Sequence, residues 1–404
     1  MNKPVVLYKF GGSSLANPDR ILTVAKKIKK ALSEYKVIVV VSAIGDYTDE
    51  IIHKKREFTS SLNKREMDLI LSTGEMISSA ILCMKLEEIG VPAKSFNAYQ
   101  VGIITDNNFG NAYIRDIEKK DNILKAISEG YIPVIAGFQG ITREGELTTI
   151  GRGGSDTTAV AISHVINAEE CVLFSDVDGV FTADPRIVKN ARLLKRICYD
   201  EMSELAHAGA QVINHRALEL SRKYGVRLVV RSSFSDGMGT LIDEEGDVEK
   251  SCISGITYNK KSAKISILGI TQKDMASLNI MGAISDAKIP IEMIQQNITY
   301  DGLENMNILV ARDDLIKAIS CIEKFSKSFE RLIYDADVGS VSIVGKGLKD
   351  KNGILFKIMS LLSNENIPVY LVNTSEVKVL IVINATDVEK TVLFLHKGLE
   401  LDKL

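Results

Sequence analysis

The sequence predicts an α/β protein in which a parallel-sheet domain is followed by two smaller ferredoxin-like βαββαβ domains. Near the N-terminus, the apolar run 4–8, a helical segment and the β-branched run 37–42 follow one another. This order of strand, helix and strand is typical of a parallel sheet, and a continuous apolar run indicates a strand buried on both faces. An internal repeat in the C-terminal part of the chain predicts the two smaller domains.

The first strand ends in the motif Lys9-Phe10-Gly11-Gly12-Ser13-Ser14. A lysine and two glycines after a strand can offer an ammonium and backbone N–H groups to a phosphate, although such a pair also suits an ordinary tight turn. A second cluster, Gly151-Arg152-Gly153-Gly154-Ser155-Asp156, again precedes a helical run. The two clusters could converge on one anion. Neither matches GxxxxGK[ST] or GxGxxG, so the usual mononucleotide and dinucleotide folds are not supported.

The elements between and after these motifs follow from local signals. A helix is expected from Pro18 to about Ser33, because Asn17 can cap it, Pro18 suits its first position and Asp19 favours its first turn. The other expected elements of this domain are helices over 76–89, 117–129, 157–166, 199–207 and 212–223, strands over 93–96, 102–106, 131–138, 171–175 and 227–231, and a hairpin over 142–149. The strand over 227–231 is expected to be the last of this domain, and the polar segment 235–247 is expected to be a loop or linker that closes it.

Polar segments follow several of these strands at their carboxyl ends, where open α/β sheets bind ligands. The segment 42–49 includes Ser42 and Thr48, and the segment 176–186 is rich in aspartate. Turn formation alone explains much of both segments. The second segment could also hold a base, a ribose and a Mg²⁺-bound phosphate. Glu75 stands at a helix start, where it is either a capping acid or a partner for a substrate ammonium.

Composition excludes several classes of protein. The formal net charge of −2 offers no basic surface for nucleic acid and no polybasic patch for a membrane. The five cysteines are far apart and lack a CxxC pair, which argues against zinc and against a disulfide framework. We expect most of them to be small core residues. No stretch is expected to reach membrane-spanning length, and the absence of a signal peptide at Met1 favours a cytoplasmic protein.

The motifs occur together in the order seen in aspartate kinases of the amino-acid kinase superfamily, and the resemblance covers the whole chain. The segments that carry it are Lys9–Gly12, Ser42–Thr48, Ser72–Glu75, Ala136–Gly140, Gly151–Asp156, Asp176–Arg186 and Arg231–Ser233. This sequence departs from the family pattern at Ser13, where Thr is common, and at Phe181, where Tyr is usual. It also has Asn214-His215 in place of His-Pro, which puts the local helix geometry in doubt.

The resemblance implies roles for individual residues. It implies catalytic roles for Lys9 and Asp176. It assigns a nucleotide site to Lys9, Phe10, Gly11, Gly12, Ser175, Asp176, Phe181 and Arg186. It assigns the aspartate site to Ser42, Thr48, Glu75, Arg152, Gly153 and Ser155. In this assignment Arg152 grips a carboxylate with two hydrogen bonds, and Glu75 pairs with the α-ammonium.

The implied reaction is transfer of a phosphoryl group from ATP, with Mg²⁺, to the side-chain carboxylate of L-aspartate. A carboxylate with an ordinary pKa of about 3.9 is already ionised at neutral pH, so the transfer needs no general base. The five histidines accordingly lie outside the motifs. The remaining work is in-line placement of two anions and neutralisation of charge, and we expect no metal held by protein side chains alone.

The repeat in the C-terminal part resembles a tandem pair of ACT domains. Residues 265–269 correspond to 341–345, and residues 289–291 correspond to 367–369. The resemblance implies that an amino-acid effector, lysine with or without threonine, binds near 271–275 and 295–297 in the first copy and near 373–377 in the second. The expected effector residues are Met275, Gln296, Asn297, Asn373, Thr374, Ser375 and Glu376. The alternative is a dimerisation module without a ligand.

We therefore expect a catalytic domain over 1–243, a first ACT-like domain over 244–335 and a second over 336–404, with the possibility that the last two interleave. Pairing of exposed sheet edges predicts a homodimer or homotetramer. Two other functions stay open. One is another acyl-phosphate-forming kinase, acting on glutamate or acetylglutamate, although most such relatives lack paired ACT domains. The other is a sensor without activity, which need not keep Lys9, Arg152 and Asp176 together.

Overall fold

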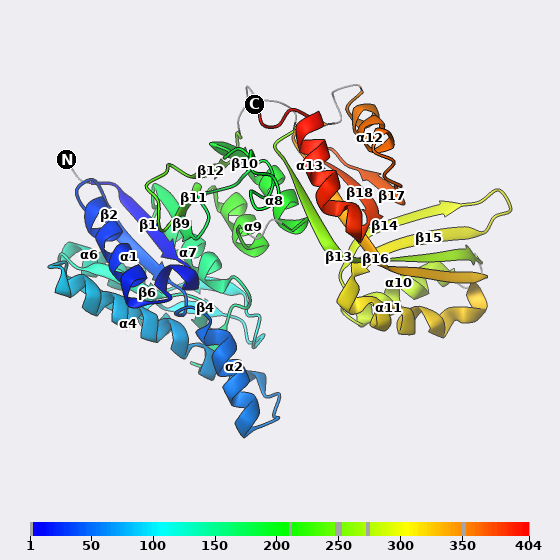
Figure 1. The fold of residues 1–404 in the computed structure, drawn as a ribbon. Coiled ribbons are helices and arrows are strands. Elements are labelled where there is room, and N and C mark those ends of the chain that lie inside the picture. The colour runs from blue at the N-terminus through cyan, green and yellow to red at the C-terminus, as the bar shows by residue number, and fades with distance from the viewer. Residues whose placement is uncertain (1–2, 210–211, 247–252, 272–274, 349–352, 404) are drawn as a thin grey trace. The chain divides into compact units, whose positions relative to one another are not determined.

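The computed structural model describes residues 3–209, 212–246, 253–271, 275–348 and 353–403. The chain forms two compact units (Figure 1). The N-terminal unit comprises Met1–Phe181, Leu193–His207 and Gln211–Lys250, and the C-terminal unit comprises Thr182–Arg192, Ala208–Ala210 and Ser251–Leu404. The chain therefore passes between the units several times instead of through one linker.

An eight-stranded sheet forms the centre of the N-terminal unit, with strand order β10-β12-β11-β9-β1-β2-β6-β3. Every pairing from β11 to β3 is parallel, as predicted, and β12 runs antiparallel to β11. The strands are β1 (Val5–Phe10), β2 (Lys36–Val41), β3 (Ala93–Phe96), β6 (Ile132–Ala136), β9 (Glu170–Ser175), β10 (Arg196–Cys198), β11 (Leu228–Ser232) and β12 (Thr240–Asp243).

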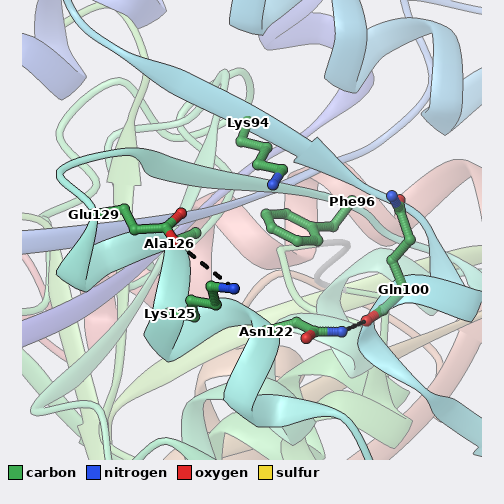
Figure 2. A pocket seen from close by; sticks show the side chains of 7 residues that line it. All are labelled: Lys94, Phe96, Gln100, Asn122, Lys125, Ala126 and Glu129. Carbon is green, nitrogen blue, oxygen red and sulfur yellow. Dashed lines mark hydrogen bonds and ion pairs between the residues drawn. The ribbon is translucent and has the colours of Figure 1, made fainter.

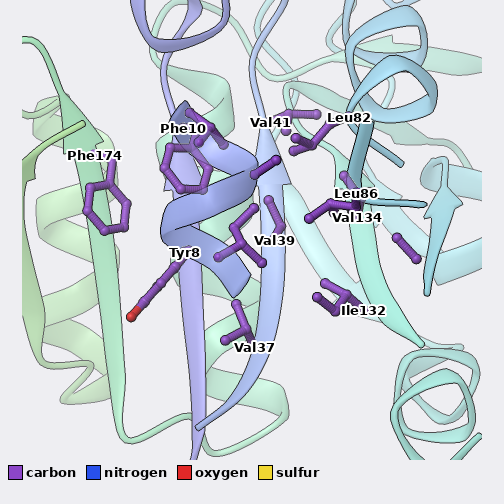
Figure 3. Packing of buried hydrophobic residues seen from close by; sticks show 14 of the residues in the cluster. Tyr8, Phe10, Val37, Val39, Val41, Leu82, Leu86, Ile132, Val134 and Phe174 are labelled. Atoms are coloured by element: carbon purple, nitrogen blue, oxygen red, sulfur yellow. The ribbon is translucent and has the colours of Figure 1, made fainter. Parts of the chain in front are cut away.

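Side-chain alternation along β1 and β2 gives each face of this sheet its own core. One face packs against helices α1 (Pro18–Ala31) and α4 (Thr73–Glu88). Figure 3 shows the main members of this cluster, in which the rings of Phe10 and Phe174 stack 4.7 Å apart. Alternation turns Leu7 and Lys9 to the opposite face, where α7 (Gly154–Val165) contacts β1, β2 and β9.

Local signals explain where the helices begin. Asn17 caps α1 by accepting a hydrogen bond from Arg20 N at 3.0 Å, and Pro18 occupies the first position, as predicted. The helix expected over 117–129 is α6 (Lys120–Ser128), and the strand before it, β5 (Ile114–Ile117), was not predicted. The other helices of this unit are α2 (Tyr47–Phe58), α3 (Lys64–Leu71), α5 (Ala98–Val101), α8 (Tyr199–His207) and α9 (His215–Tyr224).

The prediction that no stretch reaches membrane-spanning length is wrong on length. Helices α3 and α4 follow one another closely, and the helical stretch Lys64–Glu88 is long and apolar enough to cross a membrane by length and composition alone. Of its most apolar window, 44% is buried inside the protein. The core helix of a folded domain can pass the same test of length and composition. Polar residues are among the buried ones in α4, including Glu75, Ser78 and Ser79.

A small four-stranded sheet with the order β5-β4-β7-β8 lies beside this framework. It consists of β5 with β4 (Ile103–Thr105), β7 (Gln139–Ile141) and β8 (Leu147–Thr149), and β7 and β8 form the predicted hairpin. Asp68 of α3 is fully buried and ties this sheet to the helix. Its carboxylate accepts hydrogen bonds from Thr149 N, Thr149 Oγ1 and Gly110 N at 2.7–2.9 Å.

The prediction that β11 is the last strand of this domain is wrong. Strand β12 returns antiparallel to β11, and β10 pairs with β12 at the edge of the sheet. The segment expected as a linker therefore contains a sheet strand. Arg196 of β10 fixes this edge, because its guanidinium forms ion pairs with Asp243 at 2.6 Å and Glu245 at 2.7 Å.

The C-terminal unit contains the predicted repeat of strand, helix, strand, strand and helix. The first copy consists of β13 (Gly255–Ile270), α10 (Ala276–Asp286), β14 (Ile291–Ile298), β15 (Glu304–Ala311) and α11 (Leu315–Ile322). The second consists of β16 (Arg331–Val344), α12 (Ile354–Asn364), β17 (Leu371–Thr374), β18 (Lys378–Asn384) and α13 (Val388–Gly398). One six-stranded sheet joins them in the order β14-β15-β13-β16-β18-β17.

The two copies interleave through their long first strands. The first part of β13, 255–259, pairs with the end of β16, whereas its last part, 264–268, pairs with 331–335. Ile256 therefore belongs to the hydrophobic core under α12 and α13, while Ile265 and Ile267 belong to the core under α10 and α11. Each copy contributes a strand segment to the core of the other.

The segment 182–192 completes the core of the second copy. Ala183 and Val188 are buried within this core, and Thr182 O accepts a hydrogen bond from Ile256 N at 2.8 Å. The Thr182 hydroxyl is also 2.9 Å from Nε2 of His396, which is buried in α13. This burial lowers the pKa of His396. A stretch from the middle of the chain is thus packed as part of the C-terminal unit.

Candidate active site

The carboxyl ends of the central strands meet at one edge of the large sheet. Backbone hydrogen bonds continue past the strands there, from Gly137 N to Val41 O, Ser42 N to Phe10 O, Gly11 N to Phe174 O and Ser233 N to Ser175 O, at 2.8–3.3 Å. The predicted motifs after β1, β2, β6, β9 and β11 are therefore neighbours. β1 lies between β2 and β9, so its loop is central.

Lys9 lies in the middle of this edge and forms an ion pair with Asp156, with Nζ 2.6 Å from Oδ1. Both side chains are about one-seventh exposed. Asp156 belongs to the first turn of α7, where the helix dipole favours a carboxylate. The two glycine-rich motifs of the sequence are thereby brought together, and the ammonium is held at the N-terminal end of a helix.

The loop after β1 needs glycine at position 12. A Cβ on Gly12 would lie 2.7 Å from Gly45 O and 2.8 Å from Ala43 O, whereas a Cβ on Gly11 would make only ordinary contacts. The loop is further tied to β11 by a buried hydrogen bond of 2.5 Å between the hydroxyls of Ser14 and Ser233. The β1 and β2 loops can therefore approach each other closely.

Glu75 is buried at the start of α4, with 4% of its surface exposed. Oε1 accepts a hydrogen bond from Ala43 N at 3.1 Å, while Oε2 is buried without a partner. Burial raises the pKa of Glu75 to about 8, although Ala43 N and the charge of Lys9 act in the opposite direction. An unpartnered carboxylate oxygen in such a place can accept a hydrogen bond from an incoming cation.

Two further predicted residues, Ser42 and Thr48, belong to the segment that follows β2, and both are half-buried. Thr48 lies in the first turn of α2. Ser155 is buried in α7 and packs against the backbone at the end of β6. A Cβ on Gly137 would lie 2.8 Å from Ser155 Cβ. The predicted aspartate-site residues Ser42 and Ser155 thus both lie near the carboxyl end of β2.

Arg152 is exposed in the loop before α7, and its backbone is held by α9. Asn214 caps α9 through a hydrogen bond from Arg216 N to Oδ1 at 3.0 Å, and its Nδ2 donates to Arg152 O at 2.9 Å. The Asn214-His215 departure therefore leaves a regular capped helix. Gly153, at φ +70°, has no room for a side chain, because a Cβ would lie 2.4 Å from Asn214.

The segment after β9 carries the expected nucleotide residues. Ser175 Oγ donates to Asp176 Oδ1 at 3.0 Å, and Asp176 is exposed. Phe181 pairs with Leu193 in an isolated β-bridge. Arg186 lies in the segment that packs with the C-terminal unit, where it forms a bidentate pair with Asp184. Phe10, expected in the same site, has its ring fully buried in the core, so only its backbone is available.

The expected effector residues lie in the C-terminal unit. Met275 is exposed at the start of α10, Gln296 and Asn297 are exposed on β14, and Asn373 and Thr374 end β17, ahead of Ser375 and Glu376. Residues 272–274 lie outside the described residues. Gln295 Nε2 donates to Val372 O at 2.6 Å, so the expected segments of the two copies lie next to each other.

Among the described residues, no group of three or more His, Cys, Asp and Glu side chains could hold a metal ion. The four described cysteines, Cys83, Cys171, Cys198 and Cys321, are buried, as expected for core residues, while Cys252 lies outside the described residues. Burial raises the pKa of Cys83 and of Cys171 to about 12.

A pocket of about 300 Å³ lies elsewhere in the N-terminal unit, between edge strand β3 and α6 (Figure 2). Polar side chains that line this pocket already interact with other groups of the protein. Asn122 Nδ2 donates to Gln100 O at 2.7 Å, and Lys125 pairs with Glu129 at 3.9 Å. None of the motif residues lines it.

Several residues of this site were missing from the prediction. Asp156 was within the second glycine motif, but its pairing with Lys9 depends on β1 turning Lys9 toward α7. Asp68 and Arg216 carried no motif at all. Arg216 Nη1 donates to Ile150 O at 2.7 Å and Nη2 to Ala112 O at 2.5 Å. Only the fold brings residues so distant in sequence together.

The fold and this arrangement are those of the amino acid kinase family, whose model matches residues 4–232, more than half of the chain. A model of the ACT domain matches residues 341–399. The chain is 39% identical to an aspartokinase of Corynebacterium glutamicum, with 98% of this chain and 96% of that protein covered. It is 38% identical to an aspartokinase of Helicobacter pylori, with coverages of 99% and 100%.

The solved structure of Clostridium acetobutylicum aspartate kinase has the same fold, with a TM-score of 0.81 at 24% identity, and covers 97% of this chain and 99% of that one. Within the amino acid kinases, this chain belongs to the aspartokinases, the kinases that phosphorylate aspartate.

Proposed function

We propose that this protein transfers the γ-phosphoryl group of ATP to the side-chain carboxylate of L-aspartate and forms 4-phospho-L-aspartate. One observation carries the proposal. At the carboxyl ends of the central strands, an ion pair with Asp156 fixes Lys9. The charge of Lys9 is close enough to the buried Glu75 to offset part of the rise that burial causes in the pKa of Glu75, and one oxygen of Glu75 has no partner. A fixed cation and a buried acceptor suit a phosphate and an amino acid side by side.

In this proposal Glu75 binds the α-ammonium of aspartate through Oε2, and Arg152 binds the α-carboxylate. Ser42, Thr48, Gly153 and Ser155 complete the aspartate site. Arg152 is exposed on a loop whose backbone is fixed, so its guanidinium is free to meet a carboxylate with two parallel hydrogen bonds. Binding of the ammonium would deprotonate Glu75, because the charge pair favours the ionised form.

The nucleotide is proposed to lie over the loops after β1 and β9. Lys9 and the N–H groups near Gly11 and Gly12 bind its phosphates, while Asp176, Ser175 and Phe181 line the other side. Mg²⁺ is usually held by one or two carboxylates together with substrate phosphates and water. The exposed Asp176 fits such a role.

The transfer step needs charge neutralisation and alignment. The attacking carboxylate is ionised at neutral pH, so no residue has to remove a proton from it. Lys9 stabilises the negative charge that spreads over the transferred group, and Asp156 keeps the ammonium in place. Mg²⁺, when bound with ATP, supplies further charge neutralisation.

The test is ATP turnover with L-aspartate, L-glutamate or N-acetylglutamate, with hydroxylamine present to trap an acyl phosphate as a hydroxamate. We expect a hydroxamate with aspartate that is lost in Lys9→Ala. Formation of a hydroxamate with glutamate or N-acetylglutamate instead would identify that acid as the substrate. Turnover with none of the three acids would favour a sensor without activity.

We further propose that the C-terminal unit binds lysine, with or without threonine, at Met275, Gln296, Asn297 and the segment Asn373–Glu376, and that this binding reduces the kinase activity. The adjacency of β14 and β17 supports a shared binding region. The terminal strands of a sheet can pair with those of another chain, and we propose that the C-terminal unit assembles the protein into a homodimer or homotetramer in this way. Activity that does not change across millimolar lysine and threonine would contradict the regulatory proposal. We place the enzyme in the cytoplasm, with its ATP supply.

A further inference from the structure

The loop that carries Arg152 is fastened on two sides by residues that no motif identified. On one side, Asp68 holds Thr149 and Gly110 through three hydrogen bonds of 2.7–2.9 Å. On the other, the first turn of α9 holds Arg152 O through Asn214 and Ile150 O through Arg216. The backbone that leads from β8 to Arg152 is therefore held at Thr149, Ile150 and Arg152.

Of the two sets of contacts that hold this loop, those from α9 reach closest to Arg152. The guanidinium of Arg216 bridges Ile150 O and Ala112 O and stacks on the Tyr113 ring, with its centre 4.1 Å from the ring centroid. Asn214 uses both ends of its amide. Oδ1 caps α9, and Nδ2 donates to Arg152 O. Because Gly153 lacks a side chain, Asn214 can pack directly against the loop.

We propose that Asn214 and Arg216 are positioning residues that aim Arg152 at the substrate carboxylate, so that the first turn of α9 sets the affinity for the amino-acid substrate. The inference rests on the proposed binding of that carboxylate by Arg152. The chemistry follows from the contacts. An arginine that grips a carboxylate with two hydrogen bonds loses side-chain rotamer freedom on binding, so a backbone that is already fixed lowers the remaining entropic cost.

Asn214→Ser isolates the positioning contact. Serine caps a helix about as well as asparagine, but it is too short to cap α9 and also donate to Arg152 O. We expect the KM for aspartate to rise roughly 3- to 10-fold, as for loss of one neutral hydrogen bond, while the KM for ATP and the Tm stay unchanged. Asn63→Ser is the matched control. Asn63 caps α3 through Arg65 N and Glu66 N and should leave both KM values unchanged.

A double-mutant cycle separates aiming from general damage to the fold. In an Arg152→Ala background, Asn214→Ser should have no further effect on the KM for aspartate, since the side chain that it aims is gone. Arg216→Lys keeps the charge but loses the bridge, and should act in the same direction as Asn214→Ser. Asn214→Ala should show the same rise in KM together with a lower Tm, because it also removes the cap.

The outcomes are distinguishable. If the wild type phosphorylates aspartate and Asn214→Ser leaves its KM unchanged, or if the two substitutions are additive in the cycle, the positioning role is wrong. If the wild type shows no aspartate-dependent turnover, the proposed function itself fails. A rise in KM for ATP equal to that for aspartate would also overturn the inference, because it would indicate a general distortion.

Discussion

At the scale of single residues, the site is defined by charges whose environments differ. Lys9 and Asp156 compensate each other at 2.6 Å, whereas Glu75 is buried with one oxygen unpartnered. The sequence identified Lys9 and Glu75 through motifs. It could not identify the partner of Lys9, because that pairing depends on which face of the sheet Lys9 occupies. It could not predict the pKa of Glu75, which depends on burial.

Removal of the Asp156 charge should leave the Lys9 ammonium in the site but no longer hold it in one position. We expect Asp156→Asn to lower kcat by about 10- to 100-fold, and Lys9→Ala to lower it by at least about 100-fold, since each weakens a preorganised charge at the transferred group. Steady-state kinetics with saturating ATP measure both. An Asp156→Asn enzyme with wild-type kcat would show that the ion pair is not needed to place Lys9.

Glu75 should make aspartate binding depend on pH. With the pKa of Glu75 at about 8, the free enzyme carries a neutral Glu75 at pH 6.5 and must lose a proton to pair with the ammonium. We expect the KM for aspartate to fall as the pH rises from 6.5 toward 8.5. The KM of Glu75→Gln should be high and nearly independent of pH. A flat KM profile in the wild type would contradict this assignment.

The same group should affect stability with a definite sign. The folded-state pKa of Glu75 is raised above its usual value of 4.5, so its protonated form stabilises the fold below that value. This stability decreases between pH 4.5 and about 8, by at most about 1.4 kcal/mol per pH unit. At pH 8.5 and above, Glu75→Gln should therefore unfold at a higher urea concentration than the wild type, and at pH 4 at a similar one.

At the scale of elements, the loop after β1 depends on one glycine of its pair. Gly12→Ala should destabilise the protein and raise the KM for ATP, because its Cβ would lie 2.7 Å from Gly45 O and push apart the loops of β1 and β2. Gly11→Ala is the matched variant in the same loop, since its Cβ would make contacts of 3.6 Å or longer. Thermal unfolding and ATP kinetics should separate the two. Equal loss of Tm in both would show that the crowding at Gly12 is relieved elsewhere.

The sequence predicted most elements in order, from β1 through the ferredoxin-like repeats. It failed where tertiary pairing decides. The short β12 was interpreted as a linker, since Thr240–Asp243 has little pattern of its own and becomes a strand by pairing with β11 and β10. Residues 114–117 were not predicted as a strand, and they become one by pairing with β4. Asn214 raised doubt because of its departure from the family pattern, yet it supplies an ordinary helix cap.

At the scale of the whole molecule, the two ACT-like copies are not separable along the sequence, because β13 and β16 each serve both cores. Ile256→Ala changes a residue of the first copy, but it should destabilise the core under α12 and α13, by about 2–5 kcal/mol. We expect it to lower hydrogen-exchange protection in α13 first. Ile267→Ala on the same strand is the control, and should act first on α10. Loss of protection confined to α10 in Ile256→Ala would refute the interleaved assignment.

The segment 182–192 also has a consequence for biosynthesis. Val188 and Val392 belong to the same hydrophobic core of the folded protein, but Val188 leaves the ribosome about 200 residues ahead of Val392. At 5–20 residues per second, this apolar stretch waits roughly 10–40 seconds for its partners. The N-terminal unit can complete its sheet with β12 during that time, but it must do so with 182–192 still uncovered. The nascent chain therefore carries a chaperone-accessible segment until translation reaches the last helix.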